Sequence, residues 1–263
     1  MKKISLNYLI IAIFAIVTAF VSCDKNNDGD NNGNGNEDKD VYLLVKISED
    51  NDNGDGIKFE YDNQNRIKKM IFDYGLTLLY DYNNAGDLTM MKWEDETDDN
   101  DIAIITKNGN KIILNFSSGE HEWSMSFELN AQGLPVKLMT GEDESEQYFI
   151  FQYQNGNLKK LESLWWDEND NMTKLDFYMN YTYDDKKSPF YHCKTPKWLF
   201  VFLTILCENH YNFGIQNNVI SMTSDYGKLI NCDYTYNDEG FPLIRKVKEG
   251  HNNFTQTFKY EKR

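Results

Sequence analysis

Hydrophobic and polar residues alternate with a period of two along most of the chain from residue 41 onward. Ile57, Phe59 and Tyr61 alternate with Lys58 and Glu60. Successive side chains of a β-strand point to opposite sides of the sheet, so each such run predicts a strand with one buried and one wet face. Further runs of this kind lie at 76–82, 112–116, 123–129, 134–138, 173–183, 230–236, 241–247 and 254–260.

Short polar breaks rich in Asn, Asp and Gly separate these runs. Asn and Gly tolerate the positive φ of tight connections, and Asn108-Gly109 and Asn155-Gly156 are strong hairpin signals. The breaks recur about every 20 to 25 residues, which predicts a repeating unit the size of a hairpin. The sequence therefore predicts an all-β protein, an antiparallel meander that forms a curved sheet or a barrel. The breaks lie at 62–66, 82–87, 107–111, 130–133, 154–157, 167–171 and 237–240.

One segment, 195–210, departs from the alternation. Thr195 is placed to cap a helix and Pro196 suits the first helical position. Apolar residues then surround the helix axis on all sides, so we expect a short buried helix near 196–208 that plugs the barrel or closes one end. A buried pair of strands is the alternative.

The first residues have the layout of a bacterial lipoprotein signal. Lys2 and Lys3 precede an apolar run from Leu9 to Val21, and Ser22 stands directly before Cys23. The run is shorter than the ~20 residues that a helix needs to cross a bilayer. We expect a signal peptide at 1–22 and a lipid-modified Cys23 that anchors the protein in a membrane.

Between the anchor and the strands lies a stretch without any apolar side chain. We expect residues 23–40 to be the lipidated cysteine and a disordered acidic tether, because such a segment cannot bury enough surface to offset its ordering entropy. Residues 41–263 then form a single β domain.

The net charge of the chain limits the kinds of partner that it can bind. The chain has 27 basic and 42 acidic residues, a net charge of −15, and removal of Lys2 and Lys3 with the signal leaves 25 against 42, or −17. Nucleic acid is excluded as a partner on this balance. The same excess keeps a surface protein soluble.

Few residues suggest catalysis. No HExxH pair, phosphate-binding glycine loop or G-x-S-x-G elbow occurs, so we expect no enzyme and no cofactor. Cys193 and Cys207 flank an apolar run and either form a disulfide or remain free thiols, as does Cys232. No close cysteine pair favours zinc.

Two weak candidate sites remain. Asn51, Asn53, Asp55 and Asp62 fall on calcium-loop positions, but Lys58 stands where an apolar residue is needed, which favours a plain hairpin turn.

Adjacent Trp165 and Trp166 point to opposite faces of a strand, so one of them is a candidate for stacking on a sugar ring. The alternative is that both lie in the core or that one is slightly exposed at a rim.

The repeated hairpin resembles a family of uncharacterised Bacteroidetes lipoproteins with a porin-like fold and YD-type hairpins. The resemblance rests on FEYDNQNRIKKM, LYDYNNAGDLTMM and DYTYNDEGFPLIRKV, on YTYDDKKSPF at 181–190 and on NNVIS at 217–221. It implies a curved antiparallel barrel without an established activity. In such lipoproteins an acidic stretch after the cysteine directs export, which implies an outer-membrane protein that faces the cell surface.

The wet faces carry charges, so we expect a porin-like but soluble barrel tethered by Cys23. The leading hypothesis is a non-catalytic binding or interaction module for a glycan or an envelope protein. The alternatives are a structural envelope lipoprotein and a hydrolase with an unrecognised acidic site.

Overall fold

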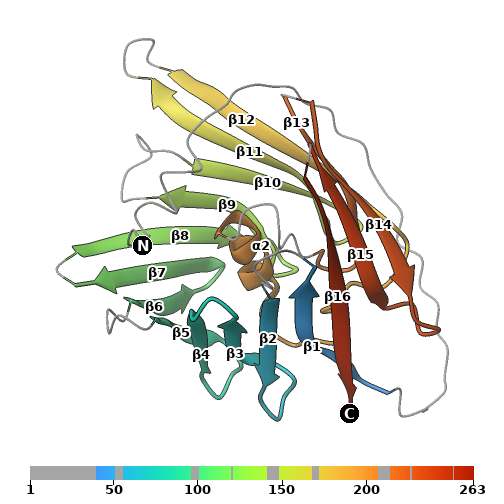
Figure 1. Cartoon of the computed structure of the whole chain (residues 1–263). Helices are drawn as coiled ribbons and strands as arrows, with labels where there is room; N and C mark the ends of the chain where they lie inside the picture. Colours follow the sequence, from blue (N-terminus) through green and yellow to red (C-terminus); the bar gives the residue numbers. More distant parts are fainter. Residues whose placement is uncertain are drawn as a thin grey trace.

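The computed structural model describes residues 40–50, 56–95, 101–119, 121–140, 148–167, 172–206, 214–225, 227–250 and 252–263. These residues form sixteen strands and the helix α2 (Figure 1). The strands are β1 Tyr42–Glu49, β2 Gly56–Tyr61, β3 Ile67–Phe72, β4 Thr77–Tyr82, β5 Leu88–Glu94, β6 Asp101–Asn108, β7 Lys111–Ser118, β8 His121–Leu129, β9 Pro135–Thr140, β10 Tyr148–Gln154, β11 Asn157–Asp167, β12 Met172–Tyr183, β13 Val219–Ser224, β14 Gly227–Tyr236, β15 Pro242–Glu249 and β16 Asn252–Lys262.

The sheet closes on itself. Each strand pairs antiparallel with its neighbours in sequence, and β1 pairs with β16 through Tyr42 opposite Lys262. The predicted meander is therefore confirmed, and it forms a closed barrel. Closure removes the exposed edges that an open sheet would leave for aggregation.

Alternate connections of a meander lie at the same end of the barrel. One end of the barrel holds its first and last residues, Val41 and Arg263, together with the connections that follow even-numbered strands. We call this end the sealed rim. The end that holds the connections after odd-numbered strands is the loop rim.

The inner face of the barrel is apolar. On β2, Ile57, Phe59 and Tyr61 are buried while Lys58 and Glu60 are exposed, and most other strands alternate in the same way. Apolar burial of this kind is the main favourable contribution to folding.

Helix α2, Lys197–Leu206, lies inside the ring of strands (Figure 1). The ring centres of Trp198 and Phe202 lie 5.7 and 5.8 Å from that of Phe127 on β8. Residues 198–203 are all buried. The predicted buried helix is thus confirmed, and it fills the barrel from inside.

The start of the helix differs from the expectation. The hydroxyl oxygen of Thr195 accepts a hydrogen bond from the amide of Ile67 on β3 at 2.8 Å, whereas the amide of Leu199 donates to the carbonyl of Pro196 at 3.0 Å. Thr195 therefore attaches the helix start to the barrel wall.

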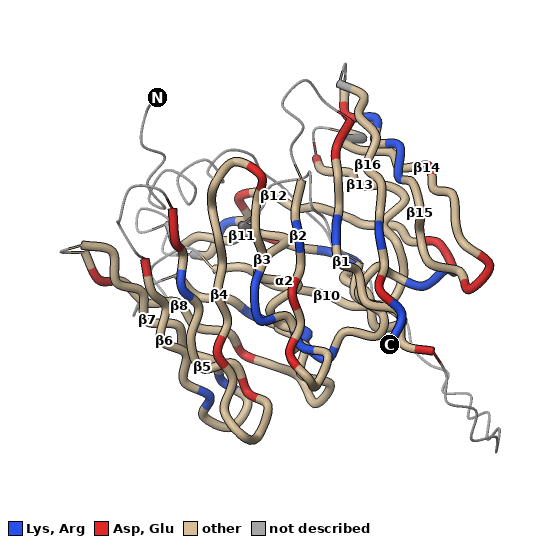
Figure 2. Tube along the Cα trace, turned by 60° about the horizontal axis from the view of Figure 1, so that its bottom comes forward, with Lys and Arg blue, Asp and Glu red and all other residues tan. Residues whose placement is uncertain are grey.

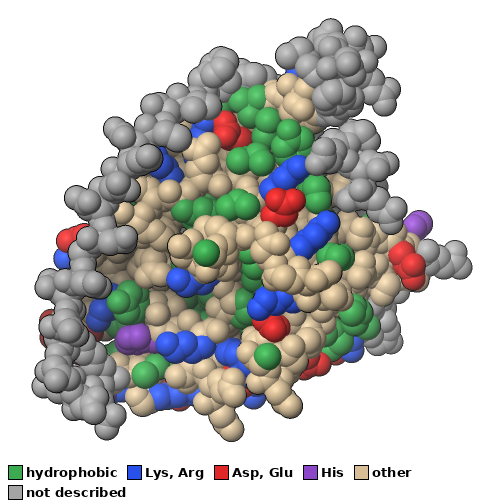
Figure 3. All heavy atoms as spheres, turned by 180° about the vertical axis from the view of Figure 1, so that it is seen from behind, with side chains coloured by type: hydrophobic (Ala, Val, Ile, Leu, Met, Phe, Trp, Pro, Cys, Tyr) green, Lys and Arg blue, Asp and Glu red, His purple; other side chains and the backbone are tan. Residues whose placement is uncertain are grey.

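Charged residues of both signs are spread over the strands of the barrel (Figure 2). Seen from behind, charged side chains are interspersed with hydrophobic ones (Figure 3). Ion pairs on the outer wall include Lys58–Asp73, Lys68–Glu60, Lys92–Glu94, Lys160–Glu162 and Lys248–Asp233.

In the described parts of the chain, no helix has the length and apolar character required to cross a membrane.

Candidate functional site

Four connections of the sealed rim share one five-residue turn, at 62–66, 83–87, 130–134 and 237–241. In each, the first amide donates to the fifth carbonyl and the fourth amide donates to the first carbonyl. The pairing register shifts by one residue just before each turn. The fourth residue has a positive φ, between 62° and 87°, and is Asn65, Gly86, Gly133 or Gly240. The recurring sequence motif is therefore a bulged turn.

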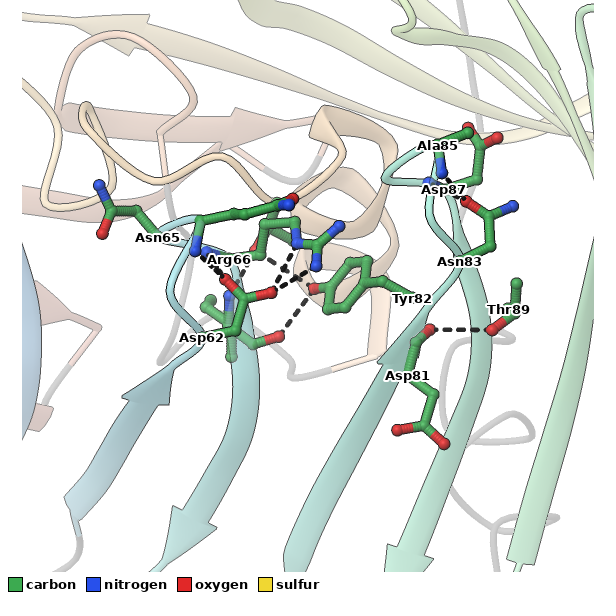
Figure 4. Close-up of polar contacts among 12 residues, drawn as sticks. Asp62, Asn65, Arg66, Asp81, Tyr82, Asn83, Ala85, Asp87 and Thr89 are labelled. Atoms are coloured by element: carbon green, nitrogen blue, oxygen red, sulfur yellow. Dashed lines mark hydrogen bonds and ion pairs between the residues drawn. The ribbon is translucent and has the colours of Figure 1, made fainter.

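The first side chain of the turn explains why Asp or Asn recurs there. The Oδ1 atom of Asp62 accepts hydrogen bonds from the amides of Gln64 and Arg66 at 2.8 and 2.9 Å. Asn83 accepts from the amides of Ala85 and Asp87 at 2.9 and 3.0 Å in the same way (Figure 4). These side chains mimic a backbone carbonyl and fix the turn.

Arg66 joins the first of these turns to the second. Its Nε atom donates to Asp62 at 2.7 Å, and its guanidinium lies 4.3 Å from the ring centre of Tyr82 (Figure 4). Burial alone would raise the pKa of the Asp62 carboxyl, but hydrogen bonds from the Arg66 amide and side chain outweigh it and hold the pKa below its usual value. Asp62 thus serves as a structural anion in the turn.

The long connection between β12 and β13, residues 184–218, crosses the sealed rim. The amide of Lys187 donates to the carbonyl of Gly240 at 3.2 Å, and the amide of Lys194 donates to that of Asn65 at 2.9 Å. The connection therefore contacts turns of distant strands before it enters the barrel as α2.

A half-buried carboxylate holds the two ends of this connection together. Asp184 accepts from the amide of Asn218 at 3.0 Å and from its side chain at 3.0 Å, and the hydroxyl of Tyr236 donates to the same carboxylate. Burial and the nearby Asp184 charge raise the pKa of the Tyr236 phenol, so it stays a donor.

Where β1 enters the barrel, aromatic rings surround Phe241. The ring centres of Tyr42 and His192 lie 5.4 and 5.3 Å from that of Phe241, and Lys187 Nζ lies 4.9 Å from it. The amide of Tyr42 donates to Nδ1 of His192 at 2.9 Å, so this nitrogen carries no proton. Burial lowers the pKa of His192, and the charges of Lys187 and Lys194 lower it further.

The loop rim has a different character. Among the described residues, β10 pairs with β11 as far as Leu164, and β11 and β12 extend past the described part of β10 (Figure 1). Trp165 on this hairpin is 39% exposed, and Tyr74 in the β3–β4 turn is 63% exposed. Both aromatic side chains present apolar surface to solvent.

Polar groups lie beside Trp165. Lys174 is its partner on β12, with Nζ 6.0 Å from the Trp165 ring centre. Ser163, two residues earlier on the same face of β11, is fully buried and donates to Asp176 at 3.3 Å. An aromatic ring thus lies 6.0 Å from a cation, and a carboxylate follows that cation two residues later on β12, which is a combination suited to binding polar cyclic molecules.

The other predicted site residues lie mostly outside the described part of the chain. These are Cys23, Asn51, Asn53 and Asp55, together with the side chain of Trp166. Because Asp62 is held by Arg66 and its three companions all lie outside the described residues, the calcium loop stays a prediction. Among the described residues, no three His, Cys, Asp or Glu side chains are grouped so that they could hold a metal ion.

Two cysteines are described, and both are free thiols. Cys193 donates to the Thr195 hydroxyl at 3.3 Å, and burial raises the pKa of its thiol. Cys207 lies outside the described residues.

The inside of the barrel holds a charged group that sequence reasoning missed. Arg245 on β15 is 3% exposed, and it donates to Cys232 at 3.2 Å and to Gln256 at 3.2 Å. Gln256 in turn donates to Glu49 at 2.6 Å. The only signal was spacing, since Arg245 stands two residues before the buried Val247 and so on the same face of its strand.

Comparison with known protein families finds no match, and no curated protein matches the sequence. Two solved structures are similar over most of the chain. One is a porin-like protein from Bacteroides uniformis, with a TM-score of 0.39 and 12% identity over 83% of this chain and 96% of that one. The other is a porin-like protein from Bacteroides vulgatus, with a TM-score of 0.39 and 11% identity over 83% of this chain and 99% of that one.

Proposed function

We propose that the protein is a lipid-anchored, non-catalytic binding module that takes saccharides at its loop rim. The observation that carries this proposal is Trp165, a large aromatic side chain 39% exposed on a hairpin that extends past the described part of β10. A ligand that covered this ring would remove its exposed apolar surface from water, which favours binding.

The groups around Trp165 suit a sugar ring. The apolar C–H face of a pyranose stacks on an indole, while its hydroxyls accept from a lysine and donate to a carboxylate. Lys174 and Asp176 supply such groups on the neighbouring strand. Sites of this kind combine aromatic surface with a few polar groups that set orientation.

The rest of the barrel holds the β11–β12 hairpin in a fixed position. Helix α2 and the turns of the sealed rim hold the strands from which the hairpin extends, so the binding groups stand on rigid elements. A preorganised site loses less entropy when it binds.

The outer wall is consistent with a barrel that stands in water on its anchor. A barrel that spans a membrane presents an apolar band to lipid. Here the outward faces carry the ion pairs Lys58–Asp73, Lys68–Glu60 and Lys248–Asp233.

A glycan array tests the proposal. The full chain should retain a small set of saccharides, and Trp165→Ala should weaken that binding at least about tenfold, because stacking on an aromatic ring is lost. Tyr191→Ala is the matched control, since Tyr191 is 47% exposed at the opposite rim, and it should bind as well as the parent chain. Absence of any retained saccharide, or equal losses in both variants, would contradict the proposal.

A further inference from the structure

The point at which the tether enters the barrel is fixed at the sealed rim. Asp40 forms an ion pair with Lys262 at 2.6 Å. The amide of Val41 donates to the carbonyl of Arg263 at 3.1 Å, and the amide of Arg263 donates back at 2.9 Å. The first and last residues of the barrel thus hold each other, and the tether leaves from a defined place.

The length of the tether limits how far this rim can be from the anchor. Residues 24–40 separate Cys23 from the barrel, and the tether expected from their sequence would span roughly 20 to 25 Å. The step rests on the lipid anchor of the proposed function. With that anchor in a bilayer, the sealed rim is the end of the barrel that reaches the lipid surface.

This rim exposes apolar groups beside the tether. Tyr191 is 47% exposed and Leu243 is 40% exposed. The ring of Tyr191 lies beside that of Phe241, two residues before Leu243 in the chain, and the ring of Phe241 lies beside that of Tyr42. Lys187 Nζ lies 5.7 Å from the ring centre of Tyr191. We call Tyr42, Lys187, Tyr191 and Leu243 the tether-root face.

We propose that the tether-root face rests on the headgroups of a phospholipid bilayer, so that the barrel is seated on the membrane with its loop rim facing away. Tyrosine is enriched at membrane interfaces because its ring is apolar and its hydroxyl polar. A lysine beside it can extend its charge toward water while its stem packs on the apolar surface.

Weak contacts are sufficient for this seating, because the anchor makes the contact intramolecular and its effective concentration high. Electrostatic attraction contributes little, since Lys187 and Lys262 are balanced by Asp40 and Glu239 in the same region. The seating should therefore persist at salt concentrations that release polybasic segments.

Photo-crosslinking tests the orientation on the lipidated full chain in nanodiscs of phosphatidylethanolamine and phosphatidylglycerol. A photoreactive phenylalanine analogue replaces Tyr191 in one sample, Leu243 in a second and Tyr74, on the loop rim, in a third. Lipid adducts are counted by mass spectrometry. The two positions of the tether-root face should give at least about ten times more adduct than Tyr74, because only that rim is held at the bilayer.

Equal yields at both rims, or no adducts at Tyr191 and Leu243, would overturn the seating. The acyl chains on Cys23 are checked on the same samples, and a chain without them would overturn the anchor and the seating together. Saccharide binding in the array does not depend on the bilayer, so failure of the seating leaves the binding proposal standing.

Discussion

The two rims of the barrel are built on different principles. The sealed rim uses one five-residue turn four times, each with an Asp or Asn first and a positive φ at the fourth residue. The long connection between β12 and β13 crosses the same end and contains α2, which fills the barrel. The loop rim has connections of varied length and sequence, and it carries the exposed Trp165 and Tyr74.

This difference shows where repetition has a structural purpose. A turn that recurs with the same hydrogen bonds sets strand register and closes the barrel, so its Asp and Asn side chains are committed to the backbone. On the loop rim the same backbone bonds occur at 72–76, but Phe72 stands first there, and its ring cannot accept the hydrogen bonds that Asp or Asn accepts. Function is therefore expected where the chain does not repeat.

The largest expected difference in unfolding free energy is between the loss of an aromatic ring in α2 and the loss of one on the loop rim. Phe202→Ala in α2 should lower the free energy of unfolding by about 3–5 kcal/mol, because Phe202 is 1% exposed and packs edge-on against Phe127. Tyr74→Ala on the loop rim should change it by less than about 0.5 kcal/mol. Urea denaturation of both variants measures the difference, and equal losses would show that α2 does not support the barrel.

A smaller effect is expected from the repeated turn. Asn130→Ala removes the acceptor for the amides of Gln132 and Leu134, each at 3.0 Å, and should cost about 1 kcal/mol of unfolding free energy. Asn115→Ala, at an exposed position of β7, is the matched control and should be neutral. If both changes are neutral in urea denaturation, the side chain does not hold the turn.

Much of this architecture follows from the sequence, because period-two alternation and Asn-Gly breaks report directly on strands and turns. The buried helix was also predictable, since residues 198–203 are apolar all round. Closure was not, because pairing of β1 with β16 depends on contacts between the two ends of the domain.

Individual side chains were harder to place. Thr195 was expected to cap α2 but accepts a hydrogen bond from Ile67, a contact across 128 residues of sequence. From its residue type Arg245 would be expected on the surface, but the pairing register of β14 and β15 places it on the inner face of the barrel. The exposure of Trp165 depends on how far β10 reaches, which no local pattern encodes.

A pH effect should be confined to the sealed rim. The pKa of His192 in the folded chain lies below its unfolded value, so its contribution to stability is complete above the ordinary histidine pKa and is lost as the pH falls through the folded pKa. Protonation would place a hydrogen on Nδ1 of His192, which could then no longer accept the hydrogen bond from the Tyr42 amide. Unfolding in urea should therefore become easier between about pH 7.5 and about pH 5.

His192→Gln provides the comparison, because an amide oxygen can accept from Tyr42 without titrating. This variant should lose part of the pH dependence that the parent chain shows over the same range. A parent chain and variant with identical profiles would show that His192 does not hold β1.

Hydrogen exchange of the full chain, with and without the saccharide that the array retains, tests the division between the rims most directly. Added protection is predicted in peptides that cover 164–175, and Trp165→Ala should abolish it. Protection that appears instead in the sealed rim, at 184–195 or 237–242, would contradict the assignment of binding to the loop rim.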